Sequence, residues 1–327
     1  MLDHVRYSVL STTWSPYADR FLPVSGQRKL STGECIAAAA SIKGITGIEL
    51  VHPWQVTPAN VDDVKAELAA HGLHAASVAA SVSGLAVYLG GSLTNDDPDV
   101  RRQAITTVTT AMEMAAALET GQINLWLGRD GFDYPFQIDY DLAWQRLLDT
   151  LREIAAHRPA VRIGIEYKLK EPRRYLLPAT AAKTLLLIAE VGAPNLGVLL
   201  DTGHALHAQE SLAETVALLH RAGKLFHVHF NDNTRLWDDD MIVGSVHFLE
   251  ILEMLYWLDR TGYRGWLSFD PHSILDDPNK CVAESLGFVQ GLIGVLNRIG
   301  RKSVEEAIAS RQVTEIMGLV RLALFER

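Results

Sequence analysis

The residues best suited to chemistry lie between positions 197 and 240. Two apolar runs there, GVLL (Gly197–Leu200) and LFHVHF (Leu225–Phe230), each lead into a cluster of aspartate and histidine. An ionised carboxylate buried at the end of an apolar run is costly unless a cation or hydrogen bonds compensate it. We therefore predict a shared cation site surrounded by Asp201, His204, His227, His229, Asp232, Asp238 and Asp240.

The mixture of carboxylate and imidazole groups indicates which metals would bind. A set without thiolates suits Mn²⁺, Mg²⁺ or Co²⁺ better than a structural Zn²⁺. His227 and His229 point to the same side of a strand, and we favour His229 as the ligand because it lies nearer the strand end. Asp238 and Asp240 could hold one cation from two sides, or belong to a solvated acidic loop. The set predicts a divalent-metal enzyme that acts on a polyhydroxylated small molecule.

Short apolar runs alternate with helical patterns along residues 1–277. The predicted strands are Tyr7–Thr12, Gly47–Val51, Ala75–Ser81, Gln122–Leu127, Arg162–Tyr167, Gly197–Leu200, Leu225–Phe230 and Trp266–Phe269. Strands that alternate with helices indicate parallel pairing and right-handed crossovers, and eight such units have the size of a (β/α)8 TIM barrel. A doubly wound open sheet is the alternative, but the phosphate-binding motifs GxGxxG and GxxxxGK[ST] are absent.

Helix boundaries and the tail complete the predicted α/β architecture. Ser31 and Glu34 form a possible capping box, and Asp97-Pro98 opens a long helix. Residues 278–327 contain two further helical patterns that are broken near Gly300. We expect a catalytic barrel domain over 1–277 and a C-terminal helical extension over 278–327, packed on the barrel or on a partner subunit.

In a TIM barrel the reactive groups sit at the carboxyl ends of the strands. Here those ends carry Trp14, Glu49, His52, Trp126, Arg129, Glu166, Lys168, Asp201, His204, His229, Asp232, Asp270 and His272. The last four strands each deliver a carboxylate or imidazole to one rim, which favours a functional site. The segment Lys170–Arg174 is expected to be a solvated charged loop.

The net charge, the cysteine content and the lengths of the apolar runs argue against several classes of function. The 327 residues carry a net charge of −9, which argues against nucleic-acid or anionic-membrane partners. The two cysteines, Cys35 and Cys281, are far apart and fit a reducing compartment. The N-terminal stretch does not look like a signal peptide, and no apolar run approaches a membrane span. We expect a cytoplasmic protein.

Several motifs resemble a known family. IEYKLKEPR (Ile165–Arg173) resembles the strand-5 signature of the xylose isomerase family, and DTGH (Asp201–His204) resembles its strand-6 acidic motif. The segment His229–Ser245 and FDPHS (Phe269–Ser273) are similar to bacterial L-rhamnose isomerases that act on many sugars. LGGSLTNDDPDVRRQAI (Leu89–Ile105) and LWLGRDG (Leu125–Gly131) also resemble that branch. The motifs keep their order from about Trp14 to Ser273.

The resemblance implies a metal-dependent aldose–ketose isomerase that moves hydrogen between C1 and C2 of an open-chain monosaccharide. It implies two metal sites, with Mn as the first choice and Co, Mg or Zn as alternatives, and a homo-oligomeric dimer or tetramer. The first site would use Glu166, Asp201, His229 and Asp270, and the second would use His204, Asp238 and Asp240, with Asp201 as a candidate bridge. The other implied roles are sugar O1 polarisation by Lys168, ring opening by His52, acid–base work by Glu166 and Asp270, and substrate contacts from Trp14, Trp54, Trp126 and His272.

Other functions on the same scaffold stay open. A ketose 3-epimerase or a polyol dehydratase would use similar groups, although Asp270 stands where the 3-epimerases carry a glutamate. An apurinic-site endonuclease is disfavoured by the net acidity, and a sugar- or metal-binding module without turnover is the non-enzyme alternative. Whether hydrogen would move as a hydride or through an enediol also stays open.

Overall fold

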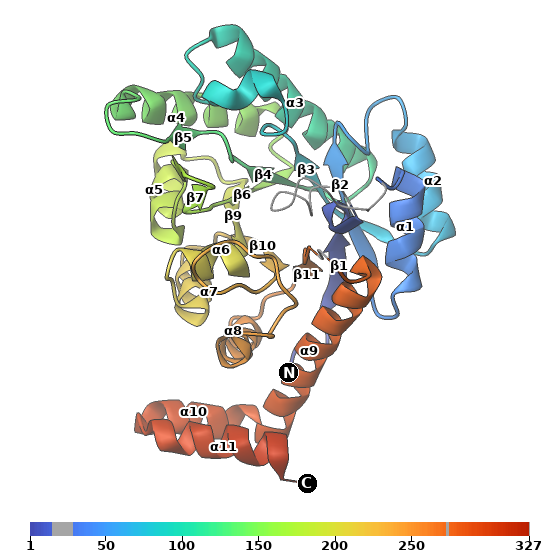
Figure 1. Ribbon diagram of the computed structural model, residues 1–327, viewed down its shortest axis with the longest axis vertical. Coiled ribbons are helices and arrows are strands. Elements are labelled where there is room, and N and C mark those ends of the chain that lie inside the picture. Colours follow the sequence, from blue (N-terminus) through green and yellow to red (C-terminus); the bar gives the residue numbers. More distant parts are fainter. Residues whose placement is uncertain (15–28, 273–274, 327) are drawn as a thin grey trace.

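A closed parallel barrel forms the centre of the molecule (Figure 1). The computed structural model describes residues 1–14, 29–272 and 275–326. Within those residues, eight strands close in the order β1-β11-β10-β9-β6-β4-β3-β2. They are β1 (Arg6–Leu10), β2 (Gly47–His52), β3 (His74–Ala80), β4 (Gln122–Trp126), β6 (Arg162–Glu166), β9 (Leu196–Asp201), β10 (Leu225–Phe230) and β11 (Trp266–Phe269). The predicted (β/α)8 TIM barrel is confirmed.

Helices follow the strands and cover the outside of the barrel. They are α1 (Thr32–Ser41), α2 (Val61–Ala70), α3 (Pro98–Ala117), α4 (Tyr140–His157), α5 (Ala181–Val191), α6 (Thr202–His207), α7 (Leu212–Arg221) and α8 (Phe248–Arg260). The Ser31–Glu34 capping box is present, and the Asp97 side chain accepts a hydrogen bond from the Asp99 amide at the start of α3. These caps satisfy amides that have no partner within their own helix. The local boundary signals therefore agree with the fold.

The interior of the barrel is polar, while the outward faces of its strands are apolar. Outward residues such as Ile48, Val198 and Val228 are fully buried in the hydrophobic core. Inside, the Ser8 hydroxyl donates to the Ser268 hydroxyl at 2.9 Å. TIM-barrel interiors are usually filled by bulky branched apolar side chains. This barrel departs from that pattern, and the polar side chains at the ends of its strands account for the departure.

The tail differs from its prediction in one respect. In its described part, three helices follow β11 rather than two: α9 (Pro278–Ile299), α10 (Arg301–Ser310) and α11 (Val313–Phe325). The break at Gly300 is confirmed, but a second break falls at Arg311, which adopts a left-handed backbone with φ 58°. Helix α9 contacts β11 and α8, and α10 and α11 form a hairpin at the end of α9 (Figure 1). The division of the chain at 277/278 stays a prediction.

The loops above β4 and β6 form a small sheet that the sequence did not predict. Strands β5 (Gly131–Phe132), β7 (Lys170–Glu171) and β8 (Arg174–Leu176) pair in the order β5-β8-β7 among the described residues. The segment Lys170–Arg174 is therefore part of a hairpin, and its prediction as a solvated loop was wrong. A Cβ on Gly131 would lie 1.9 Å from the Tyr175 carbonyl oxygen, so only glycine allows this close pairing.

Within the described residues, no helix combines the length and the apolar character needed to cross a membrane.

Candidate metal centre

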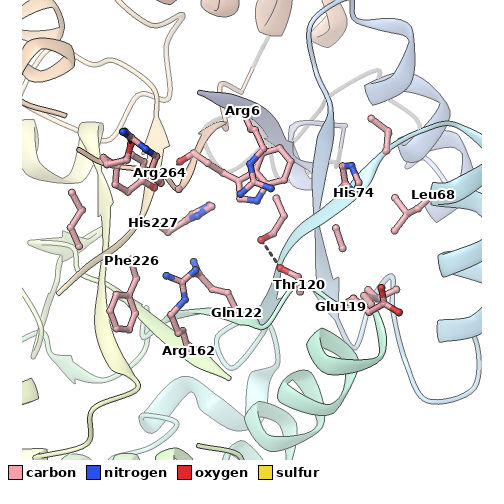
Figure 2. Close-up of a pocket in the computed structure, with 18 of the residues that line it drawn as sticks. Arg6, Leu68, His74, Glu119, Thr120, Gln122, Arg162, Phe226, His227 and Arg264 are labelled. Atoms are coloured by element: carbon pink, nitrogen blue, oxygen red, sulfur yellow. Dashed lines mark hydrogen bonds between the residues drawn. The ribbon is translucent and has the colours of Figure 1, made fainter. Parts of the chain in front are cut away.

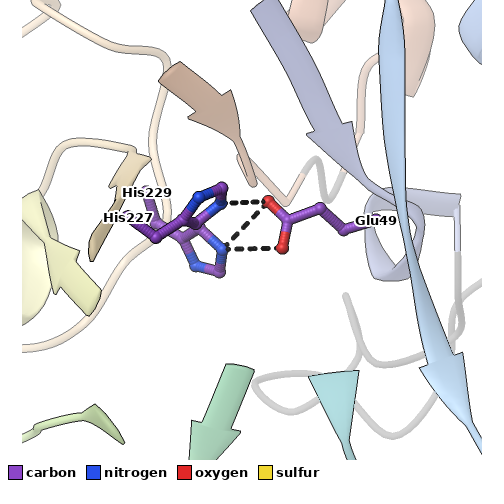
Figure 3. Close-up of side chains that lie close together, drawn as sticks. All are labelled: Glu49, His227 and His229. Carbon is purple, nitrogen blue, oxygen red and sulfur yellow. Dashed lines mark hydrogen bonds and ion pairs between the residues drawn. The ribbon is translucent and has the colours of Figure 1, made fainter. Parts of the chain in front are cut away.

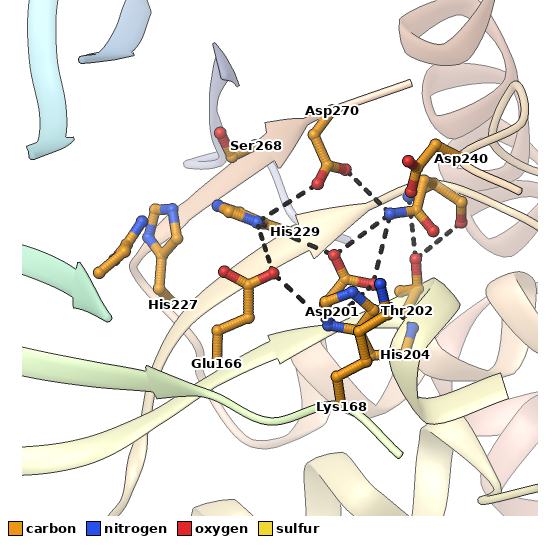
Figure 4. Close-up of polar contacts among 12 residues, drawn as sticks. Glu166, Lys168, Asp201, Thr202, His204, His227, His229, Asp240, Ser268 and Asp270 are labelled. Atoms are coloured by element: carbon orange, nitrogen blue, oxygen red, sulfur yellow. Dashed lines mark hydrogen bonds and ion pairs between the residues drawn. The ribbon is translucent and has the colours of Figure 1, made fainter. Parts of the chain in front are cut away.

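Strand register brings four predicted ligands to one end of the barrel (Figure 4). Asp201 of β9 lies opposite His229 of β10, and paired residues in parallel strands point to the same face of the sheet. His229 lies opposite Ser268, so Asp270, two residues further along, points the same way. Glu166 of β6 lies opposite Leu199, two residues before Asp201. All four side chains therefore point into the barrel.

Three carboxylates surround one nitrogen of His229. Its Nδ1 lies 3.4 Å from Asp270 Oδ2, 3.8 Å from Glu166 Oε1 and 3.9 Å from Asp201 Oδ2. This buried nitrogen has no well-aligned hydrogen-bond partner among the described residues. Asp201, His229 and Asp270 offer ligand atoms that all lie within 4.8 Å of one another, and so do Glu166, Asp201 and His204.

The other nitrogen of His229 is held from inside the barrel by Glu49 (Figure 3). The His229 Nε2–H donates to Glu49 Oε2 at 3.4 Å, and the His227 Nε2–H donates to Glu49 Oε1 at 2.7 Å. Ser77 and Asn124 also donate to this carboxylate. Because Nε2 donates to Glu49, Nδ1 is the nitrogen that faces the three carboxylates. Burial lowers the pKa of His229, but the charges of Glu49 and Asp270 outweigh it and raise that pKa well above its usual value, so Nδ1 carries a proton that a bound cation would replace.

Glu49 itself is fully buried. Burial alone would raise the pKa of the Glu49 carboxyl, but the charges of His227 and His229 outweigh it and hold that pKa well below its usual range. The sequence placed Glu49 at the rim, which was wrong: it lies three residues before the end of β2, inside the barrel. His227 is the packed, hydrogen-bonded histidine of the pair.

Asn231 joins two of the candidate ligands. Its Nδ2 donates to Asp270 Oδ1 at 3.0 Å and to Asp201 Oδ2 at 3.2 Å. The Asp201 carboxylate also accepts from the His204 amide at 2.8 Å, which caps α6. Sequence reasoning missed Asn231, and its only signal was its position two residues after His229.

The residues predicted for a second site are divided by the structure. His204 Nε2 lies 3.2 Å from Asp238 Oδ2, and His204 Nδ1 lies 3.4 Å from Glu166 Oε1. The Lys168 ammonium lies 2.7 Å from the same Asp238 oxygen, and it also pairs with Glu171. Asp240 pairs with His272 at 3.2 Å. His204, Asp238 and Lys168 thus form one group, and Asp240 and His272 form another beside it.

The buried carboxylates at this end of the barrel require positive charge close to them. Burial and the nearby carboxylates of Asp270, Asp238 and Glu166 raise the pKa of Asp201 well above its usual value, although His204 opposes this. Burial lowers the pKa of His204, but Asp201 and Asp238 outweigh it and raise that pKa to about 9. Without a cation the cluster therefore retains protons. A divalent ion would replace them, so the residues present fit a metal.

His52 lies buried at the end of β2. Its Nδ1–H donates to the Val56 carbonyl at 2.9 Å, which leaves the lone pair on Nε2. Burial lowers the pKa of His52, although this hydrogen bond opposes the change. Burial of His52 therefore favours the neutral form of its ring.

The predicted aromatic residues lie in different surroundings. The Lys168 ammonium sits over the Trp126 ring at 5.4 Å from its centroid. The Trp14 indole donates to Asn279 of α9 at 2.6 Å, and Trp54 packs against Gly84. Only Trp126 is thus placed directly against the polar cluster by these contacts.

Asp232 was predicted near the shared cation, and that prediction was wrong. Its carboxylate contacts the His247 ring at 2.7 Å and accepts from the amides of Val246 and His247, both at 2.9 Å. These bonds tie the loop before α8 to the end of β10. Its role is therefore structural.

Comparisons with known proteins agree with this fold. Residues 36–292 match the family described as Xylose isomerase-like TIM barrel. A probable sugar isomerase from Rhizobium meliloti is 30% identical over 227 residues, which cover 69% of this chain and 51% of that protein. The xylose isomerase of Thermus thermophilus is 27% identical over 209 residues, covering 62% of this chain and 54% of that protein. The chain spans about half the length of the curated relatives it matches. The finer resemblance to L-rhamnose isomerases stays a prediction.

Solved structures share the architecture at low sequence identity. D-psicose 3-epimerase from Clostridium cellulolyticum H10 superposes with a TM-score of 0.69 at 19% identity, covering 88% of this chain and 99% of that one. A xylose isomerase domain protein from Alicyclobacillus acidocaldarius gives a TM-score of 0.66 at 19% identity, with 88% and 98% covered. At these identities the similarity concerns the fold alone.

Proposed function

Because the chain belongs to the xylose isomerase-like TIM-barrel family, we propose that it is a divalent-metal-dependent enzyme that interconverts an aldose and a ketose. The observation that carries this proposal is the convergence of Glu166, Asp201 and Asp270 on the Nδ1 of His229. Buried carboxylates gathered around an imidazole nitrogen are suited to a cation. The substrate would be a monosaccharide.

The first metal would be held by Glu166, Asp201, His229 and Asp270. Their donor set of oxygen and imidazole nitrogen favours Mn, with Co, Mg and Zn as alternatives. The second would be held by His204, Asp238 and Asp240, but there it would share Asp238 with the Lys168 ammonium, so the first site is better supported. A bound divalent cation supplies Lewis-acid polarisation of sugar oxygens and lowers the pKa of a bound water.

Lys168 and His52 would act on the sugar itself. The Lys168 ammonium is fully buried, so its charge is weakly screened and would stabilise negative charge developing on the sugar O1. His52 would take a proton at Nε2 during ring opening, since its Nδ1 is committed to the Val56 carbonyl. Trp126 would exclude water on the side of Lys168.

A ketose 3-epimerase is the second candidate. It needs two bases that exchange a proton at C3 from opposite faces. Glu166 and Asp270 come from β6 and β11, which flank the β9–β10 pair on its two sides, and both approach His229 Nδ1. This arrangement is compatible with two-sided proton exchange, so product identity has to separate the two reactions.

The experiment is a panel of aldoses and ketoses incubated with the chain and Mn²⁺, with the products identified by NMR. We expect a ketose from an aldose, or the reverse, and no product inverted only at C3. An accumulation of C3 epimers would favour the second candidate instead. Turnover that survives EDTA as well as both Glu166→Gln and Asp201→Asn would refute metal-dependent chemistry at this centre altogether.

A further inference from the structure

A large cavity opens at the end of the barrel opposite the candidate metal centre (Figure 2). Its volume is about 970 Å³, which is the size of pockets that hold small molecules. Its lining includes residues at the amino ends of the strands, whereas the metal centre lies at their carboxyl ends. Those first residues are Arg6, His74, Gln122, Arg162, Leu225 and Trp266.

The cavity lining carries an excess of positive charge. Among its described residues, Arg6, Arg162 and Arg264 have no carboxylate in ion-pair contact. Glu119 is the one acidic side chain that the described residues contribute to the lining, and it is paired with Lys65 at 2.6 Å. The chain as a whole has a net charge of −9, so three uncompensated guanidinium groups here are not a general surface property.

Neighbouring groups hold the guanidinium planes in place. Arg6 lies over the Trp266 ring at 4.1 Å from its centroid, and Arg162 lies over the Phe226 ring at 5.4 Å. Arg264 is held through Nη1, which contacts the His4 ring at Nε2 and donates to the Tyr263 carbonyl at 3.2 Å. For Arg6 and Arg162, stacking occupies the face of the guanidinium and leaves its N–H edge available for bidentate bonds to phosphate or carboxylate oxygens.

The strand order sets the spacing that a ligand must match. Strands β1 and β6 are four positions apart in the eight-stranded closed order, so Arg6 and Arg162 start from opposite sides of the mouth. Both are exposed, and the buried side chains of Gln122 and His227 line the cavity below them. A single small anion is poorly suited to contact the arginines on both sides of the mouth. A molecule with two separated anionic groups can place one group beside each.

We propose that this mouth binds a small organic molecule carrying two phosphate groups. Each phosphate monoester contributes a charge of about −1.5 to −2 at neutral pH, so two of them match three guanidinium groups better than two carboxylates do. The proposal concerns the end of the barrel away from the metal centre and does not rest on the proposed isomerase activity.

The test is isothermal titration of the full chain, saturated with Mn²⁺, with propane-1,3-diol bisphosphate, a flexible probe that has no sugar hydroxyls. We expect one equivalent to bind, at least tenfold more tightly than the matching monophosphate or glutarate, with no heat from propane-1,3-diol. Higher salt should weaken the binding, because exposed charges are screened. Equal affinity for the bisphosphate and the monophosphate, or no binding of either, would overturn the proposal.

Variants locate the site. Arg162→Gln and Arg264→Gln should each weaken bisphosphate binding at least tenfold, with the fold checked by circular dichroism. Arg102→Gln removes an exposed arginine of α3 that pairs with Glu153 away from the cavity, and it should leave the affinity unchanged. Glu166→Gln should reduce metal retention and keep bisphosphate binding. Binding that is insensitive to both cavity variants, or that disappears with Glu166→Gln, would contradict this location.

Discussion

Glu49 touches two histidines from inside the barrel, and one of them, His229, faces the candidate metal centre. The carboxylate accepts from Nε2 of both rings, and its own position is fixed by donors from Ser77 and Asn124. A carboxylate behind a ligating imidazole fixes the tautomer and the ring orientation, and it raises the basicity of the ligating nitrogen. Glu49 is thus a positioning residue.

Glu49→Gln keeps the size of the side chain but removes its charge and one of its two acceptor oxygens. We expect Mn²⁺ affinity to fall about 10- to 100-fold, the usual effect of losing a partner behind a metal-ligating histidine. Manganese EPR titration measures this directly. Ser77→Ala is the matched control: it removes another contact to Glu49 without touching a histidine, and it should cost much less affinity. Unchanged Mn²⁺ affinity in Glu49→Gln would show that the pair serves only the fold.

Lys168→Ala separates catalysis from metal retention. The ammonium contacts Asp238 and Glu171 and lies over Trp126. We expect turnover to fall about 10²- to 10³-fold, the typical loss for a group that stabilises developing negative charge, while metal content is largely kept. Lys168→Arg, which keeps a positive charge beside Asp238, checks that loss of this ion pair is not the cause. Parallel loss of metal and rate would assign Lys168 a structural role.

At the scale of elements, the turn from β9 into α6 positions most of the metal centre. Every residue of α6 is buried, and the helix begins at the Asp201 cap. The DTGH motif predicted Asp201 and His204 correctly as neighbours. It did not reveal why glycine stands between them: a Cβ on Gly203 would lie 2.0 Å from the Asn231 Oδ1.

Gly203→Ala should therefore displace Asn231, which bridges Asp201 and Asp270. We expect Mn²⁺ affinity to fall about tenfold or more, because the bridged carboxylates lose their common hydrogen-bond donor. Metal titration together with thermal unfolding measures both effects. Gly291→Ala in α9, where an added Cβ meets nothing within 4 Å, is the control and should leave Mn²⁺ affinity unaltered. A normal metal affinity in Gly203→Ala would mean that the Asn231 bridge is dispensable.

The order of the elements was predictable because each strand and helix has its own local periodicity of apolar residues. All eight barrel strands follow apolar runs separated by helical patterns, and the runs need no distant partner to be recognised. The β5-β8-β7 sheet was missed because it pairs residues 131–132 with 175–176, and its pairing depends on contacts between two loops. The break at Arg311 was missed because arginine carries no turn signal of its own.

At the scale of the whole molecule, closure of the barrel decides which polar residues meet. Asp201 and His229 belong to neighbouring strands and could be associated from their motifs. Glu49 is 180 residues from His229, and only the closed order of strands brings the two together. The polar interior is thus a consequence of the fold that local sequence patterns do not reveal.

The two ends of the barrel differ in charge. The carboxyl end gathers Glu166, Asp201 and Asp270, and the amino end gathers arginines.

The homo-oligomer expected from the sequence stays a prediction. The exposed apolar side chains of α11, including Val313 and Phe325, are where a second copy could pack, and sedimentation analysis would test this.

The proposed divalent cation lies between strands β6, β9, β10 and β11. The most direct measurement is anomalous diffraction at the manganese edge from crystals of the full chain grown with Mn²⁺. We expect an anomalous peak in contact with Glu166, Asp201, His229 and Asp270. A map at saturating Mn²⁺ with no peak among these four residues, or with manganese bound only elsewhere, would contradict it.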